Sequence, residues 1–203
     1  MLLYYYLSSL SSSLPVVFFI LLRRKILFDT YQLKLLVFVV YKLITDILGL
    51  IFETYFPSAY PVFHFTVLCD FIFYSEIFAE VSQLKNKYLR LIQLGILLIA
   101  IFEGLIIGTI WENNWITTIS SYSVISIMYF LLLANSNSSM SKSKLGFTIT
   151  VFVYFSIMMV YFVFEEIIRK DFSVFIFLEP FILTLYVLFN LSLSYIICTS
   201  PKK

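Results

Sequence analysis

Seven apolar runs, each about as long as a bilayer is thick, fill most of this chain of 203 residues. A bilayer core of roughly 30 Å is crossed by about 20 apolar helical residues. The runs leave only short connections, so no room remains for a separate soluble domain. The sequence therefore predicts an all-α fold, a single domain over residues 1–203 that forms a bundle of seven transmembrane helices. The predicted spans are residues 2–22, 32–52, 61–84, 90–111, 116–135, 145–164 and 174–198.

The composition agrees with a chain surrounded by lipid. Hydrophobic residues make up 61% of it and charged residues only 13%, against about a quarter charged in an average soluble domain. Such hydrophobicity excludes intrinsic disorder, and two cysteines are too few for a disulfide scaffold. We expect a multi-pass protein of the bacterial inner (cytoplasmic) membrane, with the lipid bilayer as its main contact.

The basic residues predict an orientation. If the first helix runs from outside to inside, most Lys and Arg residues fall in inner connections, while acidic residues dominate the outer ones. Short loops with this bias set topology by the positive-inside rule. The sequence thus predicts the N-terminus outside and the C-terminus in the cytoplasm. The inner set is Arg23, Arg24, Lys25, Lys34, Lys85, Lys87, Arg90, Lys142, Lys144, Lys202 and Lys203, and the outer acids are Glu53, Glu112, Glu165, Glu166 and Asp171.

Several kinds of chemistry lack the residues they need. His64 is the single histidine, whereas zinc sites need several converging ligands. The chain has 5 glycines and no Gly-rich phosphate loop. Its basic residues form short clusters beside the membrane, which suits lipid headgroups. We therefore expect no enzymatic activity, no metal, no cofactor and no direct nucleic-acid binding.

Polar and ionisable residues inside the runs are the candidate site. A charge at the centre of a membrane helix costs about 3 kcal/mol or more, so such residues usually face the bundle interior and mark functional positions. Lys42 and Asp46 are four residues apart and share a helix face. By the rise along each helix, four of the carboxylates lie in the outer half of the membrane, above a lysine near the midplane. The candidate ligand or ion site comprises Lys42, Asp46, Asp70, Glu76, Glu103, Glu179 and Asn190.

This set of residues has two interpretations. In the first, Lys42 neutralises one or two acids and tyrosine hydroxyls hold the others, so the cluster only stabilises the bundle. In the second, the cluster binds a cation, a proton or a cationic ligand from outside, which the excess of acids over one lysine favours. The tyrosines that could donate are Tyr41, Tyr74, Tyr154, Tyr161 and Tyr186.

Gly104 and Gly108 form a small-xxx-small pair, which lets two helices approach closely. The pair predicts close packing within the chain or, alternatively, a contact between two copies.

Three segments carry a resemblance to known proteins. They are His64-Phe-Thr-Val-Leu-Cys-Asp-Phe-Ile-Phe-Tyr-Ser-Glu, Phe152-Val-Tyr-Phe-Ser and Leu188-Phe-Asn-Leu-Ser-Leu-Ser-Tyr. The chain resembles a family of small bacterial seven-helix membrane proteins without soluble domains, with a polar-acidic third helix, an aromatic sixth helix and an Asn in the last. Asp70 departs from the Glu expected there. In size and helix content the chain is also similar to the small membrane accessory proteins of RNA-targeting type VI CRISPR systems. The resemblance implies a regulatory rather than an enzymatic role.

We expect a non-enzymatic accessory or regulatory membrane protein that acts through a protein partner or as a homo-oligomer. Its context would be signalling, or antiviral defence such as modulation of a type VI CRISPR effector. The alternative is an ion or proton channel, or a small-molecule transporter, that uses the intramembrane acidic cluster. A third hypothesis is a lipid hydrolase or transferase in which Asp70 and Glu103 pair for acid–base work.

Overall fold

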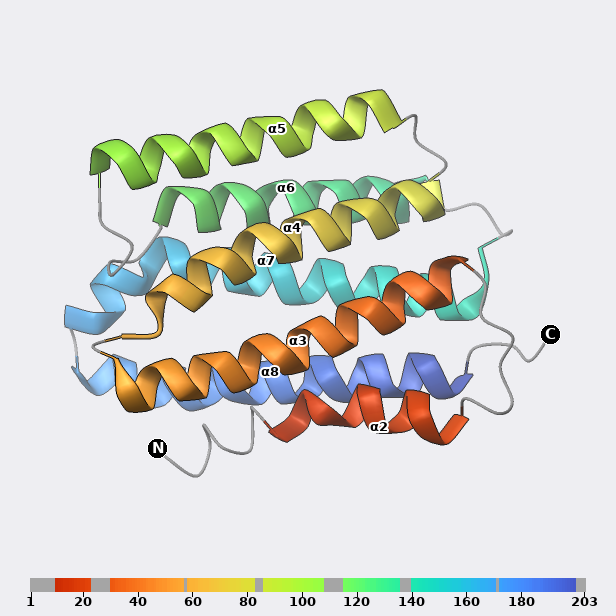
Figure 1. The fold of residues 1–203 in the computed structure, drawn as a ribbon, viewed down its shortest axis with the longest axis horizontal. Coiled ribbons are helices and arrows are strands. Elements are labelled where there is room, and N and C mark those ends of the chain that lie inside the picture. The colour runs from red at the N-terminus through yellow and green to blue at the C-terminus, as the bar shows by residue number, and fades with distance from the viewer. Residues whose placement is uncertain are drawn as a thin grey trace.

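The computed structural model is an all-helical bundle over the residues that it describes, which are 10–22, 30–56, 58–82, 86–107, 115–135, 140–170 and 172–199 (Figure 1). One short π-helix, η2, continues the helix that ends at Phe102. The elements are α2 (Ser13–Leu22), α3 (Thr30–Tyr55), α4 (Tyr60–Ser82), α5 (Asn86–Phe102), η2 (Glu103–Ile107), α6 (Trp115–Ala134), α7 (Lys142–Lys170) and α8 (Phe172–Thr199).

Six helices in the described part of the chain are long and apolar enough to cross a membrane. They confirm six of the seven predicted spans. The remaining span, 2–22, is represented by α2, which has 10 residues. Residues 2–9 of that span lie outside the described residues. The stretches that are long and apolar enough to span are Tyr31–Tyr55, Tyr60–Ser82, Lys87–Leu105, Trp115–Ala134, Lys142–Glu165 and Leu178–Ile197.

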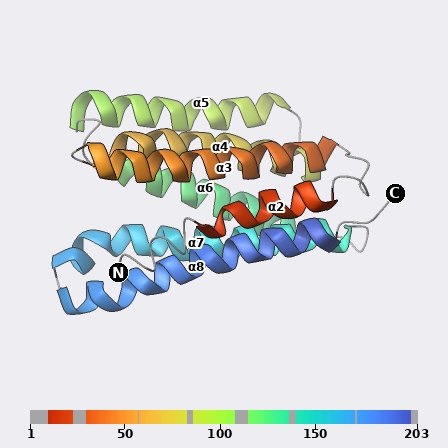
Figure 2. The same ribbon diagram turned by 60° about the horizontal axis from the view of Figure 1, so that its bottom comes forward.

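Short connections make consecutive helices antiparallel neighbours (Figure 1). α6 packs against α7, α7 against α8, and α4 against both α3 and α6. α2 lies along α8 and also contacts α3, while α5 lies at the edge of the bundle on α4 and α6 (Figure 2). The outer face of α5 presents exposed leucines, as expected for a helix that faces lipid.

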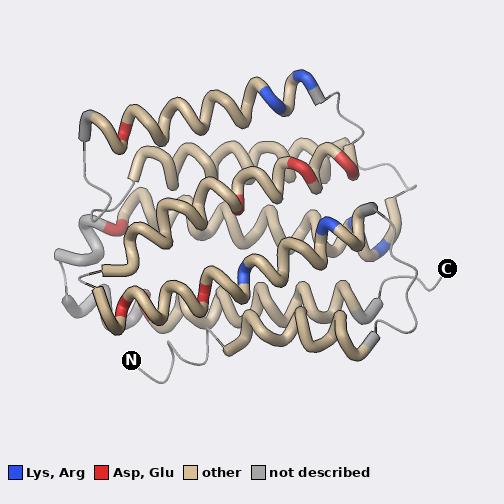
Figure 3. The backbone as a smooth tube through the Cα atoms, in the orientation of Figure 1, with Lys and Arg blue, Asp and Glu red and all other residues tan. Residues whose placement is uncertain are grey.

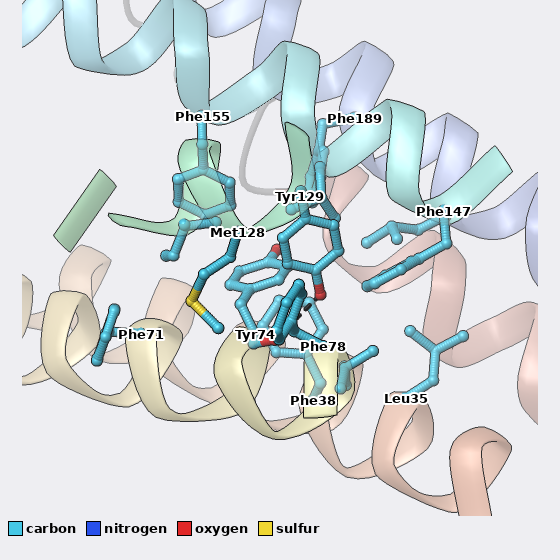
Figure 4. Packing of buried hydrophobic residues seen from close by; sticks show 14 of the residues in the cluster. Leu35, Phe38, Phe71, Tyr74, Phe78, Met128, Tyr129, Phe147, Phe155 and Phe189 are labelled. Carbon is cyan, nitrogen blue, oxygen red and sulfur yellow. Dashed lines mark hydrogen bonds between the residues drawn. The ribbon is translucent and has the colours of Figure 1, made fainter. Parts of the chain in front are cut away.

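The centre of the bundle is filled by aromatic side chains, among them rings from α3, α4, α6 and α7 (Figure 4). The ring of Tyr74 on α4 lies 4.8 Å from that of Phe38 on α3 and 4.7 Å from that of Phe155 on α7. The hydroxyl of Tyr129 on α6 donates a hydrogen bond of 3.0 Å to the Tyr74 carbonyl oxygen. Edge-to-face pairs of this kind add to the area that each ring buries. With Phe147, these rings are called the aromatic core below.

Charged residues are distributed unevenly along the bundle axis (Figure 3). One end, called the basic end, carries five basic residues, whereas Arg169 and Lys170 lie in the last turn of α7, at the opposite end. The opposite end, called the acidic end, carries Glu53 at the end of α3 and Glu165 on α7. The side chains at the basic end are Lys34, Lys87, Arg90, Lys142 and Lys144, together with the acids Glu76 and Glu80.

Candidate functional site

A buried ion pair joins α3 and α4 near the middle of the bundle. The Lys42 ammonium nitrogen lies 3.2 Å from Asp70 Oδ2, and the two side chains are only 13% and 7% exposed. The second carboxylate oxygen, Asp70 Oδ1, is also buried but has no hydrogen-bond partner among the described residues. Asp70 therefore keeps one free acceptor in a place where unsatisfied acceptors are costly.

Asp46 extends this pair toward α8. It lies one helical turn beyond Lys42, and its Oδ2 accepts a hydrogen bond of 2.8 Å from the Tyr186 hydroxyl. The Lys42 ammonium also lies 5.8 Å from the centroid of the Tyr186 ring, within the range of a cation–π contact. One turn further along α8, buried Asn190 donates to Ser11 Oγ at 2.9 Å. Polar side chains thus cross the bundle from α4 through α3 to α8 and the first helical segment.

A cavity of about 250 Å³ lies against this cluster. Its charged groups are two carboxylates and one ammonium, so its formal charge is negative when all three are ionised. Three tyrosines from α6, α7 and α8 form much of the remaining wall. The lining residues are Lys42, Thr45, Asp46, Gly49, Ala59, Val62, Phe63, Thr66, Asp70, Tyr122, Tyr154, Met158 and Tyr186.

A second cavity, of about 500 Å³, adjoins the first at the acidic end. The two share Ala59, Phe63 and Met158 in their walls. The second cavity also has Glu53 and Glu165 in its wall, at the ends of α3 and α7. The first is called the inner cavity below and the second the outer cavity. Together they extend from the acidic end to Asp70.

Toward the basic end the same interior is filled by the aromatic core. Phe38 lies one turn from Lys42 on α3, and Tyr74 lies one turn from Asp70 on α4, both in that direction. Both side chains are 1% exposed or less. The inner cavity is thus approached from the acidic end. The packed rings, which Figure 4 shows, fill the interior on its other side.

Glu76, a predicted member of the site, belongs to a different group of charges. It lies at the basic end, where its carboxylate is 2.8 Å from Arg90 and 4.0 Å from Lys34. Gln93 also donates to it at 3.2 Å. Glu80 completes the group through an ion pair of 3.2 Å with Lys34. Glu76 has its charge partners there and does not line the inner cavity.

Glu103 holds the start of α6. Its Oε1 accepts from the Ile116 backbone N–H and its Oε2 from that of Thr117, each at 2.8 Å. Both N–H groups lie in the first turn of α6, where they have no partner within the helix. Glu103 is therefore a buried helix cap supplied by η2. It makes no contact with Asp70, so the structure does not form the carboxylate pair that the hydrolase hypothesis needs.

Glu179 does not join the predicted site, and Gly104 does not pack closely against another helix of the chain. Glu179 is partly exposed on α8 and does not line the inner cavity, although its Oε2 is buried without a hydrogen-bond partner. Gly104 is exposed, and a Cβ placed there would meet nothing within 4 Å. The prediction of close packing within the chain is thus wrong at Gly104, and a contact between two copies stays a prediction. Gly108 lies outside the described residues.

The structure therefore brings together Lys42, Asp46 and Asp70, with Asn190 one turn beyond the Tyr186 that binds Asp46. The sequence interpretation did not identify Ser11, Tyr122 or Met158. The sequence contained a signal for Ser11, because a hydroxyl within an apolar run needs a hydrogen-bond partner. Tyr122 and Met158 had none, because aromatic and apolar side chains are expected at almost any position of such a bundle.

No protein family, curated protein or solved structure matches the chain. The resemblance to small bacterial seven-helix membrane proteins, and to accessory membrane proteins of type VI CRISPR systems, therefore stays a prediction.

Proposed function

We propose that this chain is a non-enzymatic, multi-pass protein of the bacterial inner membrane that carries a small cation through a site formed by Lys42, Asp46 and Asp70. The observation that carries the proposal is the Asp70 carboxylate, which lines the inner cavity and whose buried Oδ1 has no hydrogen-bond partner among the described residues. One ammonium facing two carboxylates leaves a negative charge for a cation to neutralise. Buried charges in membrane helices commonly mark such pathways.

The distribution of charge supports access from outside. We propose that the basic end faces the cytoplasm, with the N-terminus outside and the C-terminus inside, as the positive-inside rule predicts. The outer cavity then faces the periplasm, with Glu53 and Glu165 in its wall. Negative charge at the mouth of a low-dielectric cleft raises the local concentration of cations.

A carrier fits this interior better than a channel. A channel needs a continuous path, whereas packed rings lie between the inner cavity and the basic end. A carrier instead opens its central site to one side at a time. The arrangement of the cavities corresponds to a site open toward the acidic end, and release on the other side would require Phe38 and Tyr74 to move.

The test is cation flux into proteoliposomes that contain the purified chain. We expect uptake of protons or of a small cation that Asp70→Asn and Asp46→Asn each abolish. Glu80→Gln is the matched control, because it neutralises an acid of the same α4 helix at the basic end. Size-exclusion profiles and helical circular dichroism establish that each variant is folded. Wild-type protein without any cation-dependent flux, or flux that survives in folded Asp70→Asn, would contradict the proposal.

The accessory or regulatory role is the other outcome of the same experiment. A protein that binds a cation but transports none would use the site to sense it, and its output would then have to pass to a partner. That result would favour the regulatory role, including a role in signalling or antiviral defence, over transport.

A further inference from the structure

We infer that the cation bound beside Asp70 is an organic ammonium ion whose apolar body occupies the outer cavity. This inference rests on the proposed cation site and adds the chemical class of its ligand. Its three supports are the oxygen atoms that the site offers, the rings in its wall, and the shape of the two cavities.

The site offers few free carboxylate oxygens. Asp70 has one unpartnered oxygen and its other oxygen binds Lys42, while Asp46 is hydrogen-bonded to Tyr186 through Oδ2 and also to Ser12. Calcium needs six to eight oxygen ligands and magnesium an octahedral shell. Among the described residues, no three His, Cys, Asp or Glu side chains lie close enough to hold a metal ion. One free carboxylate oxygen suits an N–H donor better than a dehydrated metal ion.

The wall offers aromatic rings in fixed positions. The Tyr154 ring stacks on Phe189 at 4.3 Å between centroids, and the Tyr122 ring lies 4.8 Å from that of Phe155. Tyr186 already has an ammonium, that of Lys42, 5.8 Å from its centroid. Ammonium groups are attracted to such rings, and the attraction grows when water is excluded. A wall of rigid tyrosines with one free carboxylate oxygen therefore suits a second ammonium.

The two cavities suit a ligand with one charged end. The inner cavity holds the charges, whereas most of the outer wall is apolar or aromatic, with Phe63 and Met158 at the junction. A bound ammonium would raise the number of ammonium groups in the inner cavity to two, which equals the number of carboxylates there. A carboxylate on the same ligand would find no free cation, because Lys42 is already paired. The ligand class is therefore a monocationic amine with an apolar body.

Binding is best measured by calorimetry on the purified full chain in nanodiscs, with 2-phenylethylammonium as the probe. The matched neutral probe is 2-phenylethanol, which has the same ring and chain. We expect the ammonium to bind, and the alcohol to bind about tenfold more weakly or worse. Asp70→Asn should weaken ammonium binding by a similar factor, and Glu80→Gln should leave it unchanged. Equal binding of both probes would overturn the inference.

Three further variants distinguish the contribution of the Tyr154 ring from that of its hydroxyl, and recognition of the apolar body from recognition of the charge. Tyr154→Phe keeps the ring and should bind almost normally, whereas Tyr154→Leu should bind about fivefold more weakly or worse. Phe63→Trp narrows the junction and should exclude 2-phenylethylammonium while still admitting ethylammonium. A folded Tyr154→Leu variant that binds like wild type, or a Phe63→Trp variant that treats both amines alike, would contradict the assignment.

The outcome also distinguishes this inference from the transport proposal. Flux of protons, Na⁺ or K⁺ that depends on Asp70, without binding of either amine or competition by it, would leave transport standing and overturn the ammonium assignment. Ammonium binding that depends on Asp70, in a protein that moves no cation, would support the assignment and remove the transport role.

Discussion

At the scale of single residues, the Lys42–Asp70 pair has an energetic role beside its proposed functional one. Both side chains are almost completely buried. Replacing a buried pair as a unit is often neutral, whereas removing one partner leaves an uncompensated charge and costs about 3–5 kcal/mol. The pair is therefore expected to control stability through its balance of charge more than through its own attraction.

Lys42→Met tests this balance. It leaves Asp46 and Asp70 facing each other in an apolar interior without a cation, so we expect a loss of about 3–5 kcal/mol in the free energy of unfolding. Lys42→Met combined with Asp70→Asn removes one charge of each sign and should recover much of that loss. Reversible unfolding in mixed micelles of detergent and dodecyl sulfate measures both values. Costs that simply add in the double variant would show that the two residues are not coupled.

The sequence predicted part of this site for identifiable reasons. Lys42 and Asp46 share a face because of their spacing, and the estimated depth of Asp70 placed it within reach. Estimated depth alone also placed Glu103 and Glu179 near these residues. In the structure Glu103 caps α6 instead, and Glu179 does not line the inner cavity. Depth follows from counting residues along a helix, but the direction of a side chain depends on how each helix is rotated against its neighbours.

At the scale of the elements, α6 depends on a carboxylate from the preceding helix. Glu103 satisfies two N–H groups in the first turn of α6 from the π-helical end of α5. Thr117 is fully buried, so water cannot readily replace the bond to its N–H group. The π-helical turn and the carboxylate together link α5, the helix at the edge of the bundle, to α6.

Glu103→Ala should therefore destabilise the bundle locally. Losing a helix cap costs about 0.5–2 kcal/mol, and burial of these amides places the expected value at the upper end. Hydrogen exchange should show the amides of Ile116 and Thr117 losing protection, while those in the middle of α4 stay protected. Glu53→Gln, at an exposed position of α3, is the control. Unchanged protection in Glu103→Ala would show that the cap is dispensable.

The spans were more predictable than the helix ends. The predicted run 32–52 became Thr30–Tyr55, and 145–164 became Lys142–Lys170. Both helices extend past their apolar runs because backbone hydrogen bonds continue through polar residues until a cap or turn ends them. Hydropathy predicts which residues lie in the bilayer core, whereas the helix itself can continue beyond those residues. The η2 segment had no sequence signal of this kind.

At the scale of the whole molecule, the charge asymmetry has consequences for both insertion and function. The basic residues Lys34, Lys87, Arg90, Lys142 and Lys144 gather at one end of the bundle, and the outer cavity lies at the other. If this asymmetry directs the basic end to the cytoplasm, as the positive-inside rule predicts, it also turns the cavity toward the periplasm. Orientation and the direction of access are therefore one prediction.

Cysteine labelling in intact cells tests this prediction at two matched positions. Glu53 and Lys87 are both exposed and lie at opposite ends of the bundle. In a background with Cys69→Ser and Cys198→Ser, we expect a membrane-impermeant maleimide to label Glu53→Cys. We expect Lys87→Cys to react only after the cells are permeabilised. The reverse pattern would place the outer cavity in the cytoplasm, so that a cation would reach Asp70 from inside the cell. Because insertion follows the basic residues, moving lysines to the acidic end should invert the labelling.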